Sequence, residues 1–176
     1  MKFQEALNLF YRRCLARGLS DKTLDYYRYS LIPFGVFMGN EGIDIMEGVT
    51  EELIIKYLSI LHKKYSPVTV SDRFIALKAF INYLASSGYL IVSPITGIKK
   101  PKIPKVHART FTNKEIQLLL NAFPDREDFI QYRNHVIMCI LFGTGMRKAE
   151  LLGLTVLDIH LDICIISVIG KGNKER

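Results

Sequence analysis

A basic, proline-containing segment divides this sequence and limits, more than any other feature, how the chain can fold. It runs from Ser93 to Lys105, and its prolines stiffen it. Segments of this kind join folding units more often than they lie inside one. The sequence therefore predicts two units, at 1–90 and 109–176, connected by a linker at 91–108.

The net charge of +7 is concentrated at this junction. The stretch from Lys99 to Lys114 has no acidic residue and contains the basic residues Lys99, Lys100, Lys102, Lys105, Arg109 and Lys114. A nearly neutral chain with one basic segment indicates a protein that binds a polyanion at that segment. The same composition also fits a solvated linker that is merely basic, and charge alone leaves both interpretations open.

Four amphipathic helices are predicted within residues 1–90. Apolar residues recur at helical spacing from Phe3 to Cys14, from Leu24 to Phe37, from Leu53 to Leu61 and from Val70 to Leu84. Ser20, Thr50 and Ser66 are suitable N-cap residues for the last three helices. Pro33 is expected to kink the second helix without ending it. Four helices in a segment of this length form a small bundle with its own core.

Polar residues on two of these helices are candidates for binding DNA. The second helix carries Arg28, and the fourth carries Thr69, Ser71, Arg73 and Lys78 on one predicted polar face. Such faces are usually plain solvated surface. As a group beside the basic linker they could instead line a DNA groove, together with Lys99, Lys100, Lys102, Lys105 and Arg176.

The second unit has a mixed pattern, so the fold class is mainly α with a partial α+β region at the end. Thr112 and Glu115 form a capping box for a helix over 116–123, and the apolar helix over 128–142 is expected at the centre of a core. β-Branched residues predict a strand over 163–169, and the turn at 170–173 begins a hairpin.

Arg147 opens a short helix after Gly143-Thr144-Gly145. Glycines relax the backbone where the chain must turn, and amide groups at a helix start favour an anion. A guanidinium there is a good bidentate ligand for phosphate. Glu150 lies on the same helix face and can steady Arg147.

The remaining composition argues against other classes of protein. No apolar run approaches the length of a membrane span, and the N-terminus lacks a signal-peptide core. Cys14, Cys139 and Cys164 have no metal-type spacing and are expected to be buried free thiols. We therefore expect a cytoplasmic protein without a metal site at these cysteines.

Two motifs of this sequence together resemble those of one known family. Thr144-Gly145-Met146-Arg147 with Glu150-Leu151, and the turn from Gly170 through Lys171 to Arg176, resemble those of the tyrosine recombinases, in particular the phage integrases and Xer-type enzymes. The resemblance also covers the first unit, which is similar to that family's four-helix, SAM-like core-binding domain. The second unit resembles the opening of the catalytic domain.

The resemblance implies a reaction and assigns residues to it. Tyrosine recombinases cut one DNA strand with a tyrosine and form a 3′-phosphotyrosyl link, without metal or cofactor. Arg147 matches the arginine that contacts the scissile phosphate, and Lys171 matches the hairpin lysine thought to protonate the departing 5′-oxygen. Glu150 matches a supporting acidic position. The implied partners are double-stranded DNA and full-length recombinase protomers.

This sequence also departs from the family pattern. The family's His-x-x-Arg box and its nucleophilic tyrosine lie beyond the hairpin, where this sequence stops, so we expect a truncated chain that cannot cleave DNA alone. Three hypotheses remain: part of a recombinase that integrates or excises DNA, a non-catalytic protein that occupies recombination sites, or an unrelated helical regulator. We expect 1–90 to fold independently and the residues after about 108 to be poorly stable.

Overall fold

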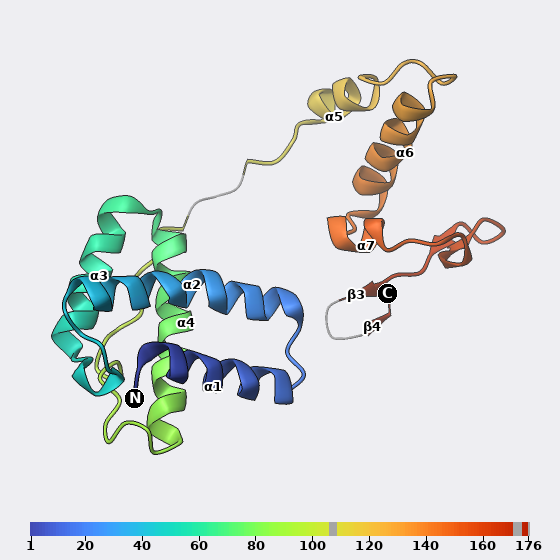
Figure 1. The fold of residues 1–176 in the computed structure, drawn as a ribbon. Helices are drawn as coiled ribbons and strands as arrows, with labels where there is room; N and C mark the ends of the chain where they lie inside the picture. Colours follow the sequence, from blue (N-terminus) through green and yellow to red (C-terminus); the bar gives the residue numbers. More distant parts are fainter. Residues whose placement is uncertain (106–108, 171–173, 176) are drawn as a thin grey trace. The chain divides into compact units, whose positions relative to one another are not determined.

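A computed structural model describes residues 1–105, 109–170 and 174–175. The chain forms two compact units, Met1–Val106 and His107–Arg176, which are described separately below. Most of the described chain is helical, and its few strands lie near the C-terminal end (Figure 1). This confirms the predicted mainly α fold.

The four predicted helices of the first unit are all present. They are α1 (Phe3–Ala16), α2 (Asp21–Asn40), α3 (Glu51–Lys64) and α4 (Pro67–Ser86), with a short 3-10 turn, η1 (Met46–Gly48), before α3. Thr50 Oγ1 accepts a hydrogen bond from Leu53 N at 3.2 Å, so this side chain caps α3 as predicted. Helix α2 continues through Pro33 without interruption.

Helix α4 is central to the first unit and contacts α1, α2 and α3 (Figure 1). The core contains large, fully buried side chains, among them Phe34, Phe74 and Phe80. The ring of Phe3 lies against Phe80, with ring centroids 5.8 Å apart. Gly35 makes this possible, because a Cβ at that position would lie 2.3 Å from the Phe3 ring.

In its described residues the second unit contains three α-helices and two small antiparallel sheets. Its elements are α5 (Asn113–Leu120), α6 (Phe129–Thr144), α7 (Lys148–Leu152), η2 (Val156–Asp158), β1 (Ile159–His160), β2 (Ile165–Ile166), β3 (Ile169–Gly170) and β4 (Lys174–Glu175). The predicted capping box of α5 is confirmed, since Thr112 N donates to Glu115 Oε2 at 2.8 Å and Glu115 N donates to Thr112 Oγ1 at 3.3 Å. Helix α5 ends at Leu120, before the predicted end at 123.

The single strand predicted over 163–169 is wrong. Strand β2 pairs with β1, whereas β3 pairs with β4 across the predicted hairpin turn. Just before β2, Cys164 has a φ of 55°, which is incompatible with a continuous strand. Ser167 N donates to the Asp158 carbonyl at 2.9 Å, which extends the pairing of β2 with β1 by one residue before β3 begins at Ile169.

The second unit buries few side chains. Among its described residues only Met146, Val168 and Glu150 are buried, and α6 has none. The expectation that 128–142 forms the centre of a core is therefore wrong for the described chain. Leu118 on α5 and Phe129 at the start of α6 are exposed.

The cysteine prediction is correct for one residue and wrong for two. Cys14 is buried in the first unit, whereas Cys139 and Cys164 are exposed in the second. The described residues hold no group of three or more His, Cys, Asp or Glu side chains that could bind a metal. Within the same residues, no helix is long and apolar enough to cross a membrane.

Candidate functional site

Arg147 is placed by the turn that ends α6. Thr144 Oγ1 donates to the Ile140 carbonyl at 2.6 Å and accepts from Met146 N at 3.2 Å. Gly145 then adopts a left-handed conformation with a φ of 64°, the usual way for a helix to stop. Met146 is buried and anchors the turn, so that Arg147 becomes the N-cap residue of α7.

Glu150 holds Arg147 at two points. Its Oε2 accepts from Arg147 N at 2.7 Å, and its Oε1 accepts from Arg147 Nη1 at 2.9 Å. The Glu150 side chain is only 5% exposed, whereas that of Arg147 is 65% exposed. The buried carboxylate therefore fixes one edge of the guanidinium, and the other donors of Arg147 face solvent.

This arrangement corrects one part of the sequence argument. We expected the backbone amides at the start of the Arg147 helix to favour an external anion. The Arg147 amide instead binds the chain's own Glu150 carboxylate, and α7 has only 5 residues. The predicted contact with phosphate therefore rests on the exposed part of the Arg147 guanidinium.

A cleft of about 390 Å³ lies beside Glu150. Gly153, Asp158 and Ile169 contribute to its walls, which joins α7, η2 and β3 in one site. Asp158 accepts hydrogen bonds from the amide and the hydroxyl of Thr155, which lower the pKa of its carboxyl group. Strand β3 therefore borders the same cleft as Glu150, the residue that orients Arg147.

Two candidates near this strand lie outside the described residues. Lys171 follows β3 directly, and Arg176 follows β4, but the structure describes neither residue. Their roles remain as the sequence predicts them. The described neighbours Ile169 and Gly170 pair with Glu175 and Lys174.

The candidates on α2 and α4 are placed individually. The Arg73 guanidinium lies 4.0 Å from the centroid of the Tyr65 ring, and Lys78 Nζ lies 5.9 Å from that of Phe74. Arg28 is exposed and forms a 3.8 Å ion pair with Asp25. The stacked and paired cations are partly held in place and retain donors for phosphate.

Ser71 does not belong to this surface. It is 0% exposed, and its hydroxyl is buried with no hydrogen-bond partner among the described residues. Its predicted place on a DNA-facing surface is wrong, because α4 packs against three helices and Ser71 lies on a buried face of it. Thr69 is partly buried, with its hydroxyl 3.0 Å from that of Ser66.

The linker lysines are all accessible. Lys99, Lys100, Lys102 and Lys105 are exposed and form no helix or strand. Arg109, which follows the linker, forms an ion pair with Glu115 of α5. The linker charge is therefore open to a polyanion, whereas part of the charge beyond it is paired internally.

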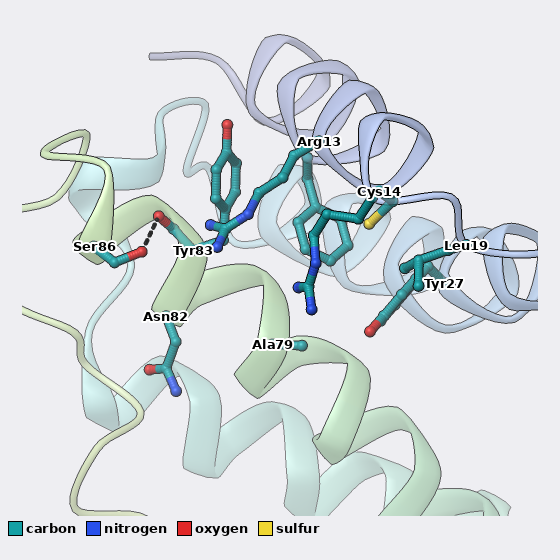
Figure 2. A pocket seen from close by; sticks show the side chains of 10 residues that line it. Arg13, Cys14, Leu19, Tyr27, Ala79, Asn82, Tyr83 and Ser86 are labelled. Atoms are coloured by element: carbon teal, nitrogen blue, oxygen red, sulfur yellow. Dashed lines mark hydrogen bonds between the residues drawn. The ribbon is translucent and has the colours of Figure 1, made fainter.

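Sequence reasoning missed a second group of cations. Arg13 and Arg17 of the first unit border a hollow of about 360 Å³ between α1, α2 and α4 (Figure 2). Arg13 lies in the last turn of α1 and Arg17 is its C-cap residue, four positions later, and this spacing was the available signal. The other side of the hollow comes from Ala79, Asn82 and Tyr83 of α4, far away in the sequence.

Comparisons with known proteins cover both units. The model of the phage integrase N-terminal SAM-like domain matches residues 7–88, and that of the phage integrase family matches residues 109–176. The tyrosine recombinase XerC of Myxococcus xanthus is 32% identical over 161 residues, which are 91% of this chain and 53% of that protein. The tyrosine recombinase XerD of Halalkalibacterium halodurans is 33% identical over 162 residues, 91% of this chain and 54% of that protein.

Solved structures show the same fold. A lambda integrase dimer bound to a COC′ core site matches with a TM-score of 0.79 at 16% identity, over 100% of this chain and 48% of that one. The XerH site-specific recombinase bound to a palindromic difH substrate matches with a TM-score of 0.70 at 23% identity, over 92% and 49%. This chain spans about half the length of the relatives that it matches.

Proposed function

Because this chain belongs to the phage integrase family of tyrosine recombinases, we propose that it binds duplex DNA at a recombination site and contacts the scissile phosphate through Arg147. The observation that carries the proposal is the pair of hydrogen bonds that Arg147 donates to the buried Glu150 carboxylate. They hold the arginine in a fixed position while the rest of its guanidinium stays exposed. The DNA-bound recombinases among the similar structures support the choice of ligand.

The proposed chemistry concerns charge at phosphorus. In strand transfer the phosphate gains negative charge in its pentacoordinate state, and a preorganised guanidinium stabilises that charge. Arg147 would contact the non-bridging oxygens, with Glu150 positioning it. Lys171 would protonate the departing 5′-oxygen, since an ammonium on a flexible stem can transfer a proton and a guanidinium cannot.

We assign the nucleophile to none of the 9 tyrosines of this sequence. The proposed role of residues 1–176 is therefore to bind DNA and hold the phosphate, while strand cleavage requires a tyrosine from outside this sequence. A full-length protomer on the same DNA is one source of such a tyrosine.

The first unit would supply much of the binding through backbone contacts. Arg28, Thr69, Arg73 and Lys78 present polar groups on α2 and α4, and Lys99, Lys100, Lys102 and Lys105 follow them on the linker. If these groups neutralise about 5 phosphates, the logarithm of the binding constant should fall with the logarithm of salt concentration at a slope of about −4.5. A nearly flat salt response would contradict the proposal.

The test of Arg147 compares two exposed arginines of the second unit. Arg147→Ala should weaken binding to a recombination-site duplex by about tenfold, as loss of a charged hydrogen bond to phosphate does. The control is Arg133→Ala on α6, whose guanidinium bonds only to Asn134 among the described residues. Titrations at fixed salt should show little loss for the control, and equal losses would sink the assignment of Arg147.

A second candidate function is a DNA-binding protein that occupies recombination sites without cutting them. The observation in its favour is that the first unit has its own buried core, whereas the second has little. Such a protein, added to a full-length recombinase and its DNA site, should slow strand exchange. The Arg147→Ala variant of this chain should slow strand exchange as well.

A further inference from the structure

The hollow between α1, α2 and α4 has the features of a binding site. Figure 2 shows Ala79 on its floor, between Tyr27 of α2 and Asn82 of α4, with Arg13 of α1 nearby. The short Ala79 side chain leaves the space that the longer side chains surround. The volume of about 360 Å³ is enough for a phosphate with part of an attached sugar.

Two arginines contribute positive charge to the hollow. Arg13 is held with its guanidinium 4.8 Å from the centroid of the Tyr83 ring, and Arg17 is the C-cap residue that follows α1. In the described part of the chain, neither arginine forms an ion pair. No acidic side chain lines the hollow. The charge there is therefore not neutralised by the first unit itself.

The neutral polar groups around the hollow can also donate. Asn82 Oδ1 already accepts from the Ser93 hydroxyl at 2.8 Å, so the amide hydrogens of Asn82 remain for another acceptor. Burial raises the pKa of the Tyr27 hydroxyl, which therefore stays protonated and able to donate. Two guanidinium groups, an amide and a phenol surround a common space with no charged acceptor among them.

We propose that this hollow is a phosphate-binding site, formed by Arg13, Arg17, Tyr27 and Asn82 around Ala79. A tetrahedral oxyanion has several acceptor oxygens and matches a set of groups that can all donate. The phosphate comes either from a DNA backbone or from a free anion. The DNA source rests on the proposed function of the chain, whereas the free-anion source does not.

The test uses one charge change, its matched control and a change that keeps all charges. Arg17→Gln removes a guanidinium from the hollow, whereas Arg12→Gln removes one from an exposed position on α1 that does not line the hollow. Ala79→Met fills the floor and leaves the net charge unchanged. Each variant of residues 1–176 is measured for thermal stabilisation by inorganic phosphate, against sodium chloride of equal ionic strength, and for affinity to duplex DNA.

We expect phosphate to stabilise the wild type and Arg12→Gln, with apparent affinity reduced about tenfold in Arg17→Gln and Ala79→Met. If phosphate stabilises no form, a loss of DNA affinity in Arg17→Gln and Ala79→Met alone would still support the site and identify the DNA backbone as its source. Stabilisation without any DNA binding would support a free anion and would contradict the proposed function instead. The phosphate site would be overturned by a different result: no stabilisation by phosphate, equal losses of DNA affinity in Arg17→Gln and Arg12→Gln, and no loss of DNA affinity in Ala79→Met. That result would leave the proposal of DNA binding intact.

Discussion

The two units of this chain differ in what holds them together. The first surrounds a central helix with three others and buries a continuous set of aromatic and aliphatic side chains. The second, in its described residues, buries only Met146 and Val168 among its apolar side chains, and fixes Arg147 through local hydrogen bonds. Stability is thus concentrated in one unit, whereas the predicted catalytic residues lie in the other.

The contrast teaches that an apolar sequence does not by itself produce a core. Helix α6 is rich in apolar residues, yet Phe129 is 75% exposed and Tyr132 is also exposed. Apolar surface of this extent usually marks a place where another structure packs. The second unit should therefore respond to mutation, and to partners, quite differently from the first.

The largest expected effect compares two phenylalanines. Phe80→Ala, at a site that is 0% exposed, should reduce the free energy of unfolding of the first unit by about 3–5 kcal/mol. Phe129→Ala should change the stability of the second unit by less than about 1 kcal/mol, because that ring is already in solvent. Urea unfolding followed by circular dichroism measures both, and similar losses would remove the contrast between the units.

Glycine substitutions should have opposite signs in the two units. Gly35→Ala should destabilise the first unit by about 1–3 kcal/mol, since the new methyl group would collide with the Phe3 ring. At Gly143 in α6 a Cβ meets no atom within 4 Å, so Gly143→Ala should stabilise that helix by up to about 1 kcal/mol. Hydrogen exchange resolved by segment can follow each change, and a stabilised Gly35→Ala protein would disprove the close approach of Phe3.

The smallest effect distinguishes the cysteines. Burial raises the pKa of the Cys14 thiol, so this residue should react slowly with iodoacetamide at neutral pH. Cys139 lies 3.3 Å from His135 Nε2, and His135 Nδ1 lies 2.9 Å from the Leu120 carbonyl, an arrangement in which the imidazole can accept the thiol proton. We expect Cys139 to react a few times faster than Cys164, which is exposed but has no histidine among its described contacts.

Peptide mass spectrometry after timed alkylation separates the three thiols. His135→Gln is the control and should bring the rate of Cys139 down to that of Cys164. Fast labelling of Cys14 in the folded protein would show instead that the core of the first unit opens readily.

Local patterns in the sequence predicted much of the first unit. Periodic apolar residues and the caps at Thr50 and Ser66 located the helices, because those signals act within a few residues of the chain. Ser71 was misplaced for the opposite reason. Its burial depends on three helices that pack around α4, which the pattern of α4 alone does not contain.

The strands of the second unit were harder to predict, because each strand pairs with residues outside its own segment of the sequence. The β-branched run over 163–169 indicated β structure, but the left-handed Cys164 lies in a turn before β2, and β2 and β3 then pair with different strands. The burial of Glu150 under Arg147 was also beyond the sequence, although their contact was expected from their spacing. The hollow beside Arg13 escaped notice because Ala79 and Asn82 join it only after folding.

The two hydrogen bonds that Arg147 donates to Glu150 also determine when the side-chain conformational entropy of the arginine is lost. A free arginine has many rotamers and must give most of them up when it meets a ligand, which weakens binding. Here the backbone amide and one guanidinium nitrogen are already restrained by a carboxylate three residues away. The ordering of this arginine therefore occurs while α7 forms, before any ligand binds.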